Sequence, residues 1–246
     1  HGRNAAAAFQ QAMNDTVDEV IAVAAAEGID ADIVKGGELN VARTPSQLAR
    51  LDAWYEAEAG WPVTGIERLD AGEAASRVGV DGVLGATWQP HCARVHPAKL
   101  VRGLAEACVR AGVELYEDTP VTEIVPGEVR TSYGAVRARA IVRATEGFTA
   151  ALRGQHRRLL PMNSSMIVTE PVPSEVWERI GWDGGEVLGD FAHVYMYAQR
   201  TADDRIAFGG RGVPYRYGSR VDADGATQAR TVESLTALLR EFFPAA

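Results

Sequence analysis

Short connections between strand-like segments constrain this chain more than any other feature. Pro126-Gly127, Tyr133-Gly134 and Thr201–Asp204 each separate two such segments. Connections this short join antiparallel neighbours, because a parallel pair needs a crossover of about a dozen residues or more. The sequence therefore predicts mostly antiparallel pairing. The strand-like segments are Val34–Arg43, Gly65–Leu69, Val83–Gln89, Val113–Tyr116, Val121–Val125, Glu128–Ser132, Ala135–Ala144, Met162–Thr169, Glu186–Asp190, His193–Gln199 and Arg205–Gly209.

Helices with one apolar face are interleaved with these strands. In residues 3–27 apolar side chains recur every three or four positions until Gly28, which predicts an amphipathic helix. A second helix begins at Thr44, whose hydroxyl can cap the free amides, and Pro45 suits its first turn. Together the elements predict an α+β fold. The expected inward positions of the first helix are Phe9, Ala12, Met13, Val17, Val20, Ile21 and Ala24.

A third helix opens at Pro97 and ends at Gly112, and a last one spans about Ala226–Phe243. Gly103 costs the third helix about 1 kcal/mol relative to alanine. Either a close neighbour requires that glycine or the helix tolerates the defect. The expected inward positions of this helix are Leu100, Val101, Leu104, Ala107, Cys108 and Ala111.

Composition and charge disfavour several classes of partner. The 246 residues are 46% hydrophobic and 24% charged, as in an ordinary globular chain. The net charge of −8 argues against broad attraction to nucleic acid or to an anionic membrane. No apolar run approaches the ~18 residues of a spanning helix. No signal peptide is recognisable either, so the expected location is cytoplasmic.

Motifs that carry chemistry are scarce. Cys92 and Cys108 are too few for a disulfide framework and lack a zinc-ligand pattern, so no metal site is predicted and Cys108 is expected to be buried. The sequence has no GxGxxG, P-loop, HExxH or GxSxG motif. The glycine-rich stretch 209–212 does not open a helix, so it is not expected to cradle phosphate.

Four stretches follow one another in an order that is typical of a known family. They are Lys35–Ala42, His96–Leu104, Pro120–Ile124 with Val136–Gly147, and Leu160–Pro171 with Ile206–Gly210. In this order and spacing the chain resembles the D-amino-acid oxidase-like (DAO) family of FAD-dependent oxidoreductases. That family includes glycine oxidase, sarcosine oxidase and γ-glutamylputrescine oxidase-like proteins. The resemblance covers nearly the whole chain.

The resemblance implies an enzyme that oxidises the C–N bond of a small amine or amino acid. Hydride would pass to FAD and oxygen would be the final acceptor. It also implies two domains. Residues 1–30 and 97–150 would form part of a Rossmann-like FAD/NAD(P)-binding domain, and residues 31–96 and 151–246 a substrate-binding domain with a mixed or antiparallel sheet and helices.

The chain departs from the family pattern in two places. Family members begin with a βαβ unit whose GxGxxG loop holds the FAD pyrophosphate, and they end with a further segment that packs on the flavin. Neither is found here. We therefore expect an internal fragment that is inactive by itself and binds FAD weakly or not at all.

Candidate site residues lie in both expected domains. The alternation in 193–199 places His193, Tyr195, Tyr197 and Gln199 on one strand face, which suits either a substrate pocket or a solvent-facing surface. Arg211 could pair with a substrate carboxylate or be a solvated loop residue. No catalytic residue is assigned. The resemblance alone implies FAD contacts, which are Val121, Ala144, Thr145 and Gly147.

Two further expectations follow. The alternative to an oxidase is a non-catalytic binding or interaction module that keeps the fold without a cofactor. In addition, Val113–Tyr116 is expected to be an unpaired edge strand, through which the chain could self-associate.

Overall fold

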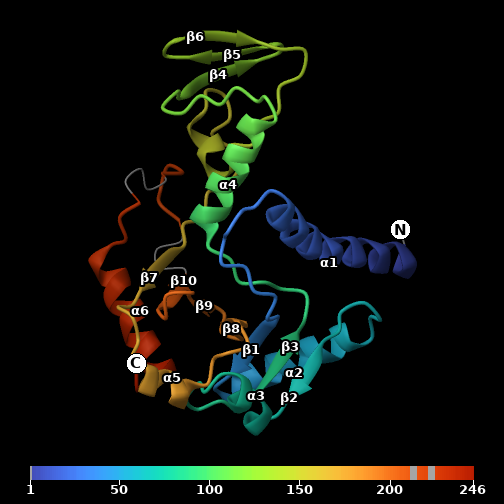
Figure 1. The fold of residues 1–246 in the computed structure, drawn as a ribbon, viewed down its shortest axis with the longest axis vertical. Coiled ribbons are helices and arrows are strands. Elements are labelled where there is room, and N and C mark those ends of the chain that lie inside the picture. The colour runs from blue at the N-terminus through green and yellow to red at the C-terminus, as the bar shows by residue number, and fades with distance from the viewer. Residues whose placement is uncertain (1, 211–214, 221–224) are drawn as a thin grey trace.

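Two separate sheets organise the chain (Figure 1). The computed structural model describes residues 2–210, 215–220 and 225–246. The larger sheet has seven strands in the order β2-β3-β1-β8-β9-β10-β7, antiparallel except for the parallel pair β1–β8. Its strands are β1 (Glu38–Ala42), β2 (Glu67–Leu69), β3 (Gly85–Gln89), β7 (Ser165–Val168), β8 (Val187–Asp190), β9 (Met196–Arg200) and β10 (Ile206–Gly210). The α+β fold class and the dominance of antiparallel pairing are confirmed.

One face of this sheet forms the hydrophobic core. Leu39, Leu188 and Phe208 point to this face and are fully buried. The helices α3 (Ala71–Arg77), α5 (Ser174–Ile180) and α6 (Ala229–Phe242) contribute the opposing apolar side chains. Trp182 stacks on Phe243 with 5.7 Å between ring centroids. Burial of these large side chains stabilises the sheet, since each contributes about 1.5–3 kcal/mol.

Local signals begin the helices as expected. The Thr44 hydroxyl accepts a hydrogen bond from the Gln47 amide at the start of α2 (Pro45–Ala59). Thr44 and Gln47 have the spacing of a capping box, but the Gln47 side chain accepts from the Arg43 amide rather than from that of Thr44, so the reciprocal bond does not form. Asp70 and Glu73 form a reciprocal capping box on α3, a signal that the sequence analysis missed.

The smaller sheet lies at the far end of α4 (Pro97–Arg110) from the larger one (Figure 1). It is an antiparallel meander of β4 (Val121–Val125), β5 (Glu128–Thr131) and β6 (Gly134–Arg137). Arg130 on β5 bridges to β4 through an ion pair with Glu123 at 2.6 Å, and it also pairs with Glu128 of its own strand at 2.9 Å. None of its strand residues is fully buried, so the meander has no core of its own.

Two predicted strand segments are wrong. Residues 113–116 form no strand, and Val113, Leu115 and Tyr116 are all more than half exposed. The predicted strand Ala135–Ala144 ends at Arg137. In both places no described strand lies alongside to pair with the backbone, and alternation of side chains alone cannot supply a partner. The edge strand on which the expectation of self-association rested is therefore absent.

Helices α1 (Gly2–Ala26) and α4 approach each other closely but leave apolar surface open. A Cβ on Gly103 would lie 2.4 Å from the Ile29 side chain, so a close neighbour requires that glycine. The inward faces predicted for both helices are largely wrong. Phe9 is 69% exposed and Val101 is 62% exposed, because no described element packs against them.

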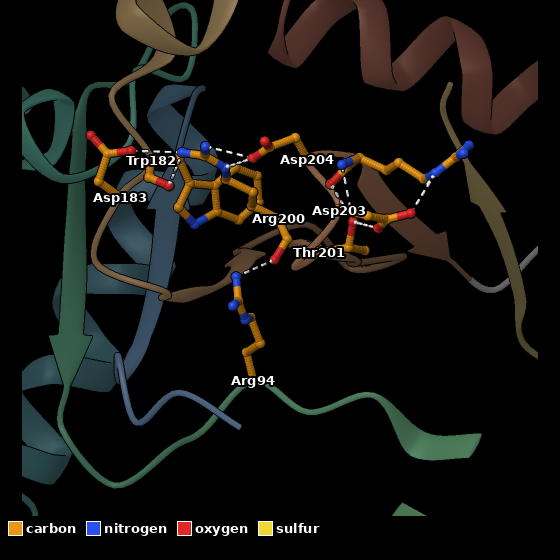
Figure 2. Close-up of polar contacts among 8 residues, drawn as sticks. Arg94, Trp182, Asp183, Arg200, Thr201, Asp203 and Asp204 are labelled. Atoms are coloured by element: carbon orange, nitrogen blue, oxygen red, sulfur yellow. Dashed lines mark hydrogen bonds and ion pairs between the residues drawn. The ribbon is translucent and has the colours of Figure 1, made fainter. Parts of the chain in front are cut away.

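Arg200, at the end of β9, ties the β9–β10 hairpin to the loop that precedes β8 (Figure 2). Its guanidinium nitrogens lie 2.6 Å from carboxylate oxygens of Asp183 and Asp204. The same group lies 4.2 Å from the centre of the Trp177 ring and donates to the carbonyl oxygen of Trp182. The Arg200 side chain is only 19% exposed, so these contacts are partly shielded from solvent.

We expect Arg200→Met to lower the free energy of unfolding by about 1–3 kcal/mol, since it removes two ion pairs and a cation–π contact together. Urea unfolding of the protein measures this. Arg137→Met is the control, because the Arg137 side chain is 82% exposed and, among the described residues, forms an ion pair with Glu128 alone. Equal losses in the two variants would contradict the role assigned to Arg200.

The two cysteines differ in exposure, and not as the sequence predicted. Cys108 is exposed, because the face of α4 that carries it is uncovered, so its expected burial is wrong. Burial, with a smaller contribution from the charge of Glu38, raises the pKa of the Cys92 thiol from 9.0 to about 11. Within the described residues no cluster of His, Cys, Asp or Glu is arranged to hold a metal ion, and no helix could cross a bilayer.

We expect iodoacetamide at pH 8 to label Cys108 rapidly and Cys92 slowly. A pKa two units above its ordinary value leaves roughly 100-fold less of the reactive thiolate. Peptide mass spectrometry over time measures both rates. Cys108→Ser should abolish the fast phase and Cys92→Ser should leave it intact. Comparable rates at the two thiols would contradict the burial of Cys92.

Candidate functional site

The face of the large sheet opposite the core carries two rows of mostly polar or small side chains, and we call it the open face. Its register follows from the strand pairs Glu38–Gln89, Gly189–Tyr197 and Tyr197–Gly209. One row consists of Gln89, Glu38, Val187, Gln199, Ala207 and Val168, and the next of Thr87, Asn40, Gly189, Tyr197, Gly209 and Met166. Helix α2 covers the β2 end of this face, where Asp52 pairs with Arg68 at 2.9 Å.

Two glycines make room for functional groups on the open face. A Cβ on Gly209 would lie 2.1 Å from Cε2 of Tyr197, so the tyrosine ring occupies the space above that glycine. A Cβ on Gly189 would lie 2.2 Å from the side-chain oxygen of Asn40. The rings of Tyr195 and Tyr197 are 6.5 Å apart. The structure therefore brings Tyr195, Tyr197 and Asn40 to one surface.

His193 lies outside this strand, which begins at Met196 rather than at His193 as predicted. The Asp190 carboxylate accepts a hydrogen bond from the Met196 amide at 3.1 Å, and the residues between them form a loop. Burial raises the pKa of Asp190, and its backbone hydrogen bonds oppose that shift. His193 Nε2 lies 3.4 Å from Nη1 of Arg50 on α2. His193 thus reaches the helix that borders the open face.

Two cavities lie at the other end of these strands, beside the row that contains Glu38 and Gln199. The first, which we call the helix cavity, has a volume of about 380 Å³ and lies between α1, α2 and the residues Glu38 and Gln89. The second, the hairpin cavity, has a volume of about 320 Å³ and includes Gln199 and Ala207. Sequence reasoning missed Glu38, although the alternation of Glu38 and Asn40 with Leu39 and Val41 was a usable signal.

The segment 92–96, part of which lines the hairpin cavity, is hydrogen-bonded to the sheet. The Gln199 side chain donates to the carbonyl oxygen of Val95 at 3.2 Å. Arg94 donates to the carbonyl oxygen of Arg200 at 2.8 Å (Figure 2). Gly37, just before β1, donates its amide to the carbonyl oxygen of Cys92 at 3.0 Å. The loop before α4 is therefore hydrogen-bonded to both sides of the site.

The residues implied as FAD contacts lie away from the open face. Val121 is paired with Thr131 in the small sheet. Ala144 and Thr145 precede the 3-10 helix η1 (Glu146–Ala151), and Gly147 borders a cavity of about 260 Å³. The Thr145 hydroxyl is hydrogen-bonded to that of Thr149 at 2.8 Å. Arg211 lies outside the described residues.

The described residues do not form a pyrophosphate site. Helix α6 follows β10 through a connection that lies partly outside the described residues. Where a strand and the α-helix after it are joined by a fully described connection, the helix begins at Thr44, Asp70, His96 or Pro173. None of those connections contains a glycine, and the first three of these helix starts are capped by the chain's own side chains. A dinucleotide needs free amides at such a start and a close backbone approach.

Curated relatives of the chain are oxidoreductases. The γ-glutamylputrescine oxidoreductase of Escherichia coli is 32% identical over 195 residues, which are 76% of this chain and 44% of that protein. The glycine oxidase of Geobacillus kaustophilus is 27% identical over 211 residues, which are 80% of this chain and 52% of that protein. The chain thus spans about half the length of these relatives.

Solved structures share the fold. The crystal structure of glycine oxidase from G. kaustophilus matches with a TM-score of 0.72 at 23% identity, covering 96% of this chain and 61% of that one. That of glycine oxidase from Bacillus cereus matches with a TM-score of 0.76 at 16% identity, covering 97% and 63%. The model of the family described as FAD dependent oxidoreductase (DAO) matches residues 1–246, and the chain belongs to that family.

Proposed function

We propose that the protein oxidises the C–N bond of a small amine or amino acid, with FAD as hydride acceptor and oxygen as final acceptor. Membership of the FAD-dependent oxidoreductase family supports the cofactor class. The observation that carries the proposal is the open face, where Tyr197 lies flat over Gly209 beside Tyr195 and Asn40. A polar and aromatic surface of this kind suits the orientation of a small substrate, while FAD, when bound, supplies the two-electron acceptor.

The residue roles in this proposal combine the described surface with the charge of one residue outside it. Tyr195 and Tyr197 would form the wall against which the substrate lies, and His193 would contribute from the loop at its edge. Arg211 lies outside the described residues and is proposed, for its charge alone, to pair with a substrate carboxylate. The small sheet and the turn that follows it would contact FAD through Val121, Ala144, Thr145 and Gly147. This divides the chain into a partial FAD-binding domain, 1–30 with 97–150, and a substrate-binding domain, 31–96 with 151–246.

We further propose that this stretch is one part of a longer protein and is inactive without the rest. The lack of a pyrophosphate site among the described residues supports this, as does the matched share of its relatives, 34–52% of their length. The uncovered apolar faces of α1 and α4 also support it, because such faces are covered in folded proteins. A cytoplasmic location remains part of the proposal.

The rival function is a binding module that keeps the sheet and has lost the cofactor. The absence of a dinucleotide cradle from the described residues favours it. The visible absorption spectrum of the purified full-length protein separates the two functions, because a bound flavin gives a band that a module without cofactor lacks.

We expect the full-length protein, purified with FAD, to lose that flavin band anaerobically with at least one member of a panel of amines, N-methyl amino acids and amino acids. Admission of oxygen should restore the band and release hydrogen peroxide. If FAD is bound and no panel member bleaches it, oxidation of C–N bonds is contradicted. The same protein reduced by dithionite is the control for a reducible flavin.

In the full-length protein we expect Gly209→Ala to lower kcat/KM for the amine that reduces the flavin at least about 10-fold, because the added methyl group displaces the Tyr197 ring. The same change should lower the free energy of unfolding by about 1–3 kcal/mol. Gly60→Ala is the control, since its methyl group meets nothing closer than 3.6 Å. In the double variant Tyr197→Ala/Gly209→Ala the stability should recover while activity stays low. Full activity in Gly209→Ala would exclude Tyr197 from the substrate wall.

A further inference from the structure

The helix cavity has two carboxylates and no lysine or arginine in its described lining. Its lining residues come in part from α1, α2 and the start of β1, three elements whose arrangement Figure 1 shows. Glu38 enters it from β1 and Glu58 from the last turn of α2. Neither lysine nor arginine is among the described residues that line it. A cavity of this size with two carboxylates favours a cationic ligand over a neutral or anionic one.

The two carboxylates are available to a ligand. Glu58 is half-buried, and in the part of the chain that the structure describes no side chain pairs with its carboxylate. The Glu38 carboxylate accepts one hydrogen bond, from the side-chain amide of Gln89 at 3.2 Å, which leaves further acceptor positions free. The negative charge of Glu38 also acts on the Cys92 thiol, whose pKa it raises in addition to the larger effect of burial.

The remaining walls suit an organic cation rather than a metal ion. Trp54 lines the cavity, is 39% exposed, and is held by Phe191 with 5.9 Å between ring centroids. A tryptophan face attracts ammonium groups, whereas a metal ion would need three or more convergent oxygen or nitrogen ligands. His91 also lines the cavity, and its buried Nδ1 has no partner among the described residues. A ligand N–H that reached this ring would satisfy it.

We propose that the helix cavity binds an organic ammonium group, with Glu38 and Glu58 as counter-charges and Trp54 as the aromatic wall. Glu38 and Tyr197 lie two positions apart along the strands and two strands apart across the sheet. This corresponds to roughly 12 Å between their Cα atoms. If the proposed oxidation takes place over Tyr197, the cavity holds a second ammonium group of the same substrate. On that basis the substrate class is a diamine or an amine with a distant cationic end.

Binding can be tested without any turnover. Isothermal titration of the full-length protein with 1,4-diaminobutane should show binding that weakens about 5-fold or more in Glu58→Gln and in Glu38→Gln. Glu56→Gln is the matched control, because Glu56 lies on the same helix but is exposed and does not line the cavity. Binding should also weaken with added salt, and 1,4-butanediol should not compete.

The outcomes distinguish this inference from the proposed oxidation. Diaminobutane binding that depends on Glu58 supports the site even if no substrate reduces the flavin. Flavin reduction in which Glu58→Gln leaves KM unchanged for diamines and monoamines alike overturns the site and leaves the oxidase standing. Equal binding of 1,4-butanediol also overturns it. So does a diaminobutane affinity that is the same in Glu38→Gln, Glu58→Gln, Glu56→Gln and the unaltered protein.

Discussion

The pairing register of the large sheet is the constraint on which the rest of the molecule depends. Because side chains alternate along each strand, one register sends Leu39, Leu188 and Phe208 to the core and Glu38 and Tyr197 to the opposite face. A shift by one residue would exchange the two sets. The energy of the apolar core therefore also fixes the polar surface, and no separate device is needed to keep carboxylate and tyrosine side chains on one face.

The glycines of the sheet contribute through the space they leave. Gly189 and Gly209 flank Tyr197 on the neighbouring strands, so the tyrosine ring can lie down on the sheet instead of standing away from it. A strand glycine normally weakens a sheet, since it adds backbone freedom and no packing. Here the neighbouring core residues on the same strands, Leu188 and Phe208, offset that loss of stability through their burial. The stable core and the adaptable surface are thus two faces of the same strands.

Local signals were predictable from sequence, and long-range partners were not. Thr44 was identified as a helix cap because its hydroxyl bonds an amide three residues away. The hairpin at Thr201–Asp204 was equally local. Residues 113–116 and 138–144 have the right alternation for strands but lack a described neighbour to pair with. The same reasoning failed for Cys108, whose helix face is apolar by sequence and uncovered in space.

The site shows the same division. Period two predicted His193, Tyr195 and Tyr197 on one strand face, but only Tyr197 lies in β9. His193 and Tyr195 lie in the loop that the Asp190 carboxylate closes by accepting from the Met196 amide, and the Tyr195 ring still lies 6.5 Å from that of Tyr197. Glu58 could not have been linked to Glu38 from the sequence, since only the packing of α2 beside β1 brings both to one cavity. Resemblance to a family named the class of cofactor, whereas contacts between distant segments define the surface that a ligand meets.

The two sheets differ in their ability to stand alone, and this bears on how the chain acts. The large sheet encloses a continuous core with four fully buried aromatic rings, Trp182, Phe208, Phe242 and Phe243. The meander β4–β6 and α4 contain no fully buried residue, and a helix of 14 residues is marginal in water without a packed face. Their stability must come from surfaces beyond the described contacts. The open face is therefore the part of the site that this chain organises by itself, and the proposed flavin contacts depend on whatever covers α4.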